Sequence, residues 1–140
     1  MAKIRSNPAA LVAFVCSALL AVGVFTFAGP CVHGDGSAAT CHTASVAVIG
    51  AGAVGALAAL AGLMASGSKG SVALYAISAI AGAFAAASPG VLFPLCMMQT
   101  MHCWTVMRPF ALVCGIALCI TAVVAAIMAS RQASKVGSRR

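Results

Sequence analysis

Apolar and small residues fill four long stretches of the chain, and polar residues gather between these stretches and at the two ends. The stretches cover residues 9–28, 43–65, 71–93 and 109–130. Each is about twenty residues long, which as a helix crosses a hydrocarbon core roughly 30 Å thick. The pattern predicts an all-α membrane protein, with four transmembrane helices and short loops forming one domain over residues 1–140.

The connections contain the residues that usually end helices or form turns. Residues 29–42 and 94–108 form two loops on one side, and residues 66–70 form a short turn on the other. Pro8 and Pro109 are predicted to open the first and fourth helices, because the first turn tolerates a missing N–H. A signal peptide is a rival explanation of the first stretch, but such apolar regions usually span only about 7–15 residues.

Composition supports lipid as the solvent of this chain. It is 63% hydrophobic and 6% charged, with a mean hydropathy of +1.11, whereas soluble domains carry roughly 25% charged residues. Asp35 is the single acidic residue. A mechanism that needs two carboxylates, or a magnesium ion held by carboxylates, is therefore excluded.

The distribution of charge predicts the orientation. Among the eight Lys and Arg residues, only Arg108 lies on the side of the two longer loops. The positive-inside rule therefore places both termini in the cytoplasm and the cysteine-bearing loops outside the membrane. Basic residues confined to ends and connections do not form a nucleic-acid surface, so no nucleic-acid partner is expected.

Small residues recur every fourth position in the second and third stretches. Such faces allow close helix packing, either inside the bundle or against another membrane protein, and both remain open. The residues concerned are Ala51, Gly55 and Ala59, and Ser78, Gly82 and Ala86.

Residues 45–55 also match the glycine pattern of dinucleotide-binding loops. No acidic residue follows that could hold a ribose, and no βαβ unit is predicted. No nucleotide site is therefore expected, and the glycines are better explained by close contacts between helices.

Seven cysteines divide into two sets. Cys16, Cys114 and Cys119 lie within apolar stretches and are expected to behave as small hydrophobic residues. The other four lie on the side predicted to be oxidising, where an even number favours disulfides. These disulfide candidates, whose three possible pairings the sequence leaves open, are Cys31, Cys41, Cys96 and Cys103.

The same loops contain residues that could instead bind copper or haem. Thioether and thiolate sulfur suit Cu(I), and histidine and methionine serve as axial haem ligands. The candidates are His33, His42, Met97, Met98, Met101 and His102. A cysteine in a disulfide is not available as a ligand, so the two interpretations compete.

Thiol–disulfide exchange is a third interpretation of the loops. Four-helix membrane oxidoreductases generally carry a Cys-x-x-Cys pair with a reactive thiolate. Here nine residues separate Cys31 from Cys41, and six separate Cys96 from Cys103. The spacing therefore favours a non-enzymatic protein.

Two charged side chains face the same predicted surface. Arg108 either reaches the lipid headgroups or pairs with Asp35, and Trp104 fits an interfacial anchor.

The cysteine-rich blocks resemble a known family. Cys31, Asp35-Gly36-Ser37 and Cys41-His42-Thr43-Ala44 precede residues 96–103, which read Cys-Met-Met-Gln-Thr-Met-His-Cys and lead into Arg108-Pro109-Phe110-Ala111. This pattern resembles small four-span bacterial membrane proteins grouped as domain-of-unknown-function family 4418. The resemblance implies the cytoplasmic membrane of a bacterium and the four-span plan, and it supplies no activity.

These observations together favour a membrane accessory or assembly subunit. Its disulfide-braced outer loops would contact a partner or further copies of the chain, and its other partner would be the lipid bilayer. A copper- or haem-binding membrane protein is the alternative, followed by a thiol–disulfide oxidoreductase.

Overall fold

The structure is a computed structural model, and it describes residues 7–28, 41–65, 69–95, 99–100 and 102–138. Its helices are α1 (Pro8–Thr26), α2 (Cys41–Met64), α3 (Lys69–Ala87), the π-helical turn η1 (Cys103–Met107) and α4 (Arg108–Gly137). Four helical segments are long and apolar enough to cross a membrane. The predicted all-α membrane bundle is therefore confirmed.

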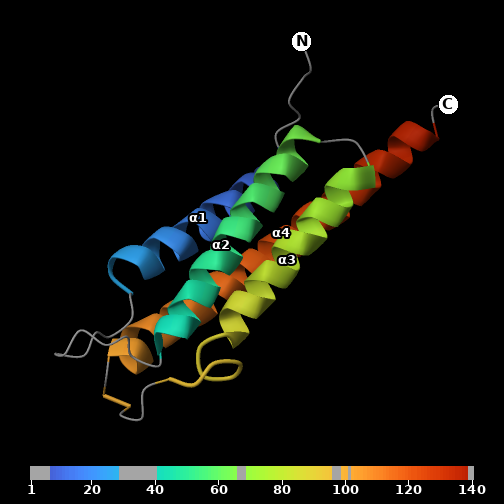
Figure 1. Ribbon diagram of the computed structural model, residues 1–140. Coiled ribbons are helices and arrows are strands. Elements are labelled where there is room, and N and C mark those ends of the chain that lie inside the picture. The colour runs from blue at the N-terminus through green and yellow to red at the C-terminus, as the bar shows by residue number, and fades with distance from the viewer. Residues whose placement is uncertain (1–6, 29–40, 66–68, 96–98, 101, 139–140) are drawn as a thin grey trace.

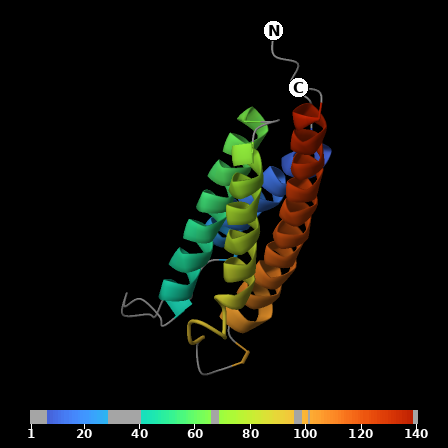
Figure 2. The ribbon, with the colours of Figure 1, turned by 90° about the vertical axis from the view of Figure 1, so that its right-hand side faces the viewer.

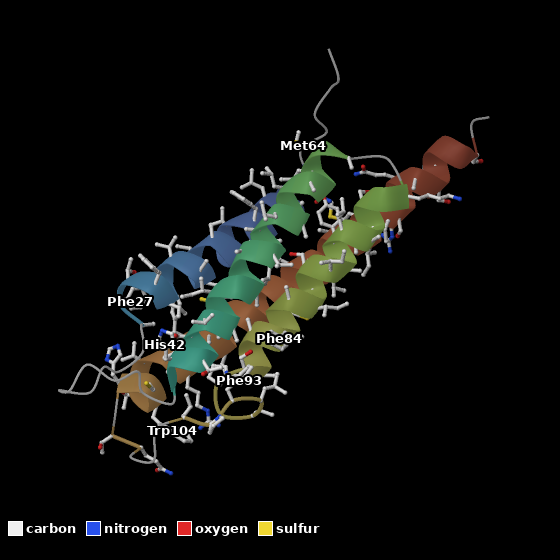
Figure 3. The ribbon with its side chains drawn as sticks, in the orientation of Figure 1. Phe27, His42, Met64, Phe84, Phe93 and Trp104 are labelled. Atoms are coloured by element: carbon white, nitrogen blue, oxygen red, sulfur yellow. The ribbon has the colours of Figure 1, made fainter. Side chains whose placement is uncertain are left out.

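The four long helices run up and down beside one another (Figures 1 and 2). Each packs mainly on its neighbours in sequence, and α1 also packs on α4, which closes the ring. The start of α1, the end of α2, the start of α3 and the end of α4 share one end of the bundle, which we call the terminal end. Phe27, His42, Phe93 and Trp104 gather at the opposite end, which we call the rim (Figure 3).

Local sequence explains where α1 begins. Asn7 occupies the N-cap position with extended backbone, and Pro8 follows at the first helical position. The Asn7 side chain is buried and its Nδ2 donates to the Ala125 carbonyl of α4 at 3.5 Å. This contact ties the start of α1 to the far part of α4.

The third helix ends at Ala87, whereas the predicted span reached residue 93. Ser88 donates its hydroxyl to the Phe84 carbonyl at 2.7 Å, Pro89 follows, and Gly90 has φ +86°. A proline and a left-handed residue cannot continue an α-helix. The remaining residues of the predicted span form a turn at the rim.

The fourth helix begins earlier and ends later than its predicted span of residues 109–130. Helical backbone starts at Cys103, six residues before Pro109, and continues to Gly137. A proline inside a helix clashes with the carbonyl four residues earlier. The π-turn η1 precedes Pro109, and its wider backbone accommodates that residue.

The core between the helices is built from small residues. Leu20, Met107, Val24 and Val48 provide most of the bulk of one cluster, and the other buried members of that cluster are alanines. Large apolar side chains point outward instead, including Leu57 and Ile80 at 68% and 69% exposure. An apolar outer surface around a thin core indicates contact with lipid.

Backbones approach closely where α3 crosses α4. A Cβ on Gly82 would lie 2.8 Å from the Gly115 carbonyl oxygen, and a Cβ on Gly115 would lie 2.8 Å from the Gly82 oxygen. On the other side of the bundle, a Cβ on Gly52 would lie 3.1 Å from the Ala21 nitrogen of α1. These glycines set the distance between the helices.

The small residues that recur every fourth position in the sequence lie at these contacts. Ala51, Gly55 and Ala59 are buried in α2. In α3, Ser78 is buried, and its hydroxyl donates to the Gly55 carbonyl at 3.1 Å across the helix pair. Gly82 lies at the crossing with α4, and Ala86 is partly exposed beside it. Gly115, the partner of Gly82, lies outside the two predicted faces.

Candidate functional site at the rim

Much of the predicted chemistry falls outside the part of the chain that the structure describes. This applies to Cys31, His33, Asp35, Cys96, Met97, Met98 and Met101. Cys41 is the first residue of α2, but its side chain is not described either. Disulfide pairing and an Asp35–Arg108 ion pair therefore stay predictions.

His102 connects the loop before α4 to the end of α1. Its Nε2 lies 2.8 Å from the Phe27 carbonyl oxygen. Because a carbonyl can only accept, this nitrogen carries the proton, and Nδ1 is left as the nitrogen that could accept or bind a metal. The interaction fixes His102 although its side chain is exposed.

Two phenylalanines reinforce the same junction. The rings of Phe27 and Phe110 meet edge to face, with centroids 5.0 Å apart and planes at 71°. Phe110 lies close above Gly23, where a larger residue would meet the ring. Aromatic pairs of this geometry contribute about 0.5–1.5 kcal/mol beyond their buried area. The end of α1 is thus held against the start of α4.

Two sulfur-containing side chains are buried in the π-turn η1. Cys103 and Met107 are both 0% exposed, and the Arg108 N–H donates to the Cys103 carbonyl to close the turn. Turns of this kind occur often at functional sites. Here the turn directs a thiol and a thioether from the rim toward the core.

Arg108 lies over the ring of Trp104, with its Cζ 4.6 Å from the ring centroid. The sequence patterns had not indicated this cation–π contact. The two residues are four positions apart in a helical segment, a spacing that puts side chains on one face and could have indicated the contact. The arginine also borders Gly90 of the neighbouring turn.

Residues 88–93 form a compact turn at the rim, which we call the rim turn. The Gly90 N–H donates to the Phe93 carbonyl at 3.0 Å, and the Phe93 N–H donates to the Ser88 carbonyl at 3.0 Å. Val91 and Leu92 project from this turn at 76% and 51% exposure. The rim turn therefore presents two apolar side chains on a hydrogen-bonded frame.

His42 lies in the first turn of α2 and is exposed. Its carbonyl accepts the Ser45 hydroxyl at 2.7 Å. Among the described residues, no group of three or more His, Cys, Asp or Glu side chains is placed to hold a metal ion. With the predicted methionine ligands undescribed, the copper and haem interpretations remain predictions.

Four apolar helices and a rim of aromatic, sulfur-containing and basic residues define a small multi-pass membrane protein. The chain belongs to the family described as domain of unknown function (DUF4418), whose model matches residues 13–128. The predicted family membership is confirmed. No curated protein and no solved structure matches the chain.

Proposed function

We propose that this protein is a non-enzymatic accessory or assembly subunit of the bacterial cytoplasmic membrane, and that its rim docks onto a partner membrane protein or another copy of the chain. The observation that carries the proposal is the rim turn. It holds Val91 and Leu92 exposed on a frame fixed by backbone hydrogen bonds.

The energetics of the rim turn favour docking. Full burial of an apolar side chain of this size contributes about 1.5–3 kcal/mol. A surface that is already ordered loses little conformational entropy when it binds, so more of that energy appears as affinity. Trp104 and Arg108 lie beside the turn, and tryptophan and arginine are the residue types enriched at binding hot spots.

The orientation forms part of the proposal. The basic residues of the terminal end favour a cytoplasmic location for that end, which leaves the rim outside. Green fluorescent protein fused after Arg140 should fluoresce, and alkaline phosphatase inserted beside Asp35 should be active. The reverse pattern would overturn the orientation.

Photo-crosslinking in intact membranes tests the docking. A photoreactive amino acid replaces Leu92 at the rim, and in the control it replaces Ile116 in the middle of α4. The two side chains are matched in exposure, at 51% and 50%. Leu92 should give one discrete protein adduct, either of a dimer or with a partner, and Ile116 should give adducts with lipid. Identical adduct patterns at the two positions would refute docking through the rim.

Copper or haem binding is a second candidate, favoured by the two buried sulfur groups of η1 beside His102. The test is metal analysis and an absorbance scan of the purified protein and of His102→Gln, since glutamine can still donate to the Phe27 carbonyl. This function would be supported if the parent protein contains metal or haem and His102→Gln, which lacks only the imidazole, does not. A reactive-thiol enzyme is less well supported, because buried cysteines are poor participants in exchange and Cys103 is fully buried.

A further inference from the structure

A groove at the terminal end has properties that the docking proposal does not use. It lies between the first turn of α3 and the last turns of α4, and has a volume of about 510 Å³. This volume falls within the range of roughly 300–1,000 Å³ that is usual for ligand sites. Its lining residues are Lys69, Val72, Ser130, Ala133 and Ser134.

The groove is positive without an acidic side chain to balance it. Lys69 lines it, and Arg131 lies in the same turns of α4, next to the lining residue Ser130. The described residues contain no Asp or Glu, because Asp35, the single acid of the chain, lies outside them. The positive end of the α3 dipole lies at the same place. The positive charge of the groove therefore favours the binding of an anion from the lipid or the solvent.

The lining changes from polar to apolar along the groove. Lys69 is the first residue of α3, and Val72 is one turn deeper. Because α4 runs toward the terminal end, Ser134 is the outermost of its lining residues and Ser130 lies one turn deeper, with its hydroxyl donating to the Ile127 carbonyl at 2.8 Å. A cation and a hydroxyl at the outer end, with Val72 and a serine whose hydrogen is already bonded within its own helix below them, match the layout of a phospholipid at the edge of a bilayer.

We infer that this groove binds one anionic phospholipid with a hydroxylated headgroup. The phosphate lies near the Lys69 ammonium group, and a headgroup hydroxyl meets Ser134. The glycerol ester and the start of an acyl chain pass along Val72 and Ala133. The apolar half of the groove is the reason to assign a lipid phosphate and not a free one.

Native mass spectrometry of the full chain in a neutral detergent tests the site. The protein is titrated with phosphatidylglycerol and, separately, with phosphatidylcholine. Phosphatidylglycerol should be retained at one molecule per chain, and Lys69→Gln should weaken its binding about tenfold, the usual size of one charge-assisted contact. Lys69→Arg should keep most of the binding. That result would show that position 69 tolerates replacement when the charge is kept.

Lys135→Gln is the matched control, because it removes the same charge at the same end but outside the lining. It should change binding less than about twofold, whereas diffuse attraction to a basic surface would weaken similarly in both variants. Equal loss in the two variants, equal retention of phosphatidylcholine, or displacement of the lipid by excess inorganic phosphate would each overturn the inference.

Discussion

The crossing of α3 and α4 allows a quantitative prediction about a single methyl group. In Gly115→Ala the new Cβ would lie 2.8 Å from the Ala86 nitrogen, 2.8 Å from the Gly82 oxygen and 2.9 Å from the Ala86 Cβ. Ordinary van der Waals contact at such a carbon begins at 3.4 Å. Two of these neighbours are backbone atoms, so no rotamer change can relieve the overlap and the helices must separate.

The size of the effect follows from two opposing terms. Overpacking of a well-packed contact costs about 1–3 kcal/mol, while replacing glycine by alanine inside a helix gains up to about 1 kcal/mol. With the full helical gain, the free energy of unfolding of Gly115→Ala should therefore fall by up to about 2 kcal/mol. The loss acts on the α3–α4 pair, where the backbones of the two helices are in contact.

Gly50→Ala is the matched control. Gly50 lies in α2 with no atom within 4 Å of a Cβ placed there, and it is exposed. The added methyl group meets no opposing contact, so the free energy of unfolding of Gly50→Ala should equal that of the parent chain or exceed it by up to about 1 kcal/mol.

Reversible unfolding in mixed micelles with increasing SDS, followed by circular dichroism, measures both variants against the parent chain. Equal stability of Gly115→Ala and Gly50→Ala would refute the backbone contact between α3 and α4, because a methyl group at that contact has no room.

Three further predictions concern the rim. Gly90→Ala places a side chain at φ +86°, which costs about 1–2 kcal/mol. Hydrogen exchange in the rim turn should therefore become faster while exchange in α2 stays unchanged. An equal change in both segments would contradict this prediction. Arg108→Ala removes the side chain that covers Trp104, and because the chain has a single tryptophan, quenching of its fluorescence by the neutral quencher acrylamide should increase; unchanged quenching would refute the contact. His102→Ala should lower the free energy of unfolding by about 0.5–1.5 kcal/mol, because it removes the donor to the Phe27 carbonyl, and thermal melting measures the loss. An unchanged melting temperature of His102→Ala would contradict the bond between His102 and the Phe27 carbonyl.

The helices could be predicted from the sequence because they depend on average properties of long stretches. Twenty apolar residues in a row have few alternatives in lipid, where every backbone group must bond within its own segment. The boundaries depend on single residues, and they were predicted less well. Pro109 indicated a helix start, but a π-turn before it lets the helix continue back to Cys103.

Contacts between segments were the hardest to predict. Ala111, Gly115 and Cys119 have the same four-residue spacing that identified the faces of α2 and α3, so the sequence contained a signal for the α4 face. It contained none for the pairing of Gly115 with Gly82, which depends on how two separate helices rotate and slide. The hydrogen bond of His102 to the Phe27 carbonyl could not be predicted either, because its acceptor is a backbone group that every residue carries.

The charged side chains that the structure describes lie at the two ends of the bundle, where we propose the docking site and the lipid site. Within the described residues, Ser17 and Ser78 in the middle of the bundle donate to the Ala13 and Gly55 carbonyls. Their hydroxyl hydrogens are bonded within and between the helices, and glycines lie at the close contacts between helices. Charged side chains that the structure describes lie at the ends, with Arg108 at the rim and Lys69 at the terminal end. This separation of charge supports the proposals of a partner at the rim and a phospholipid at the terminal end.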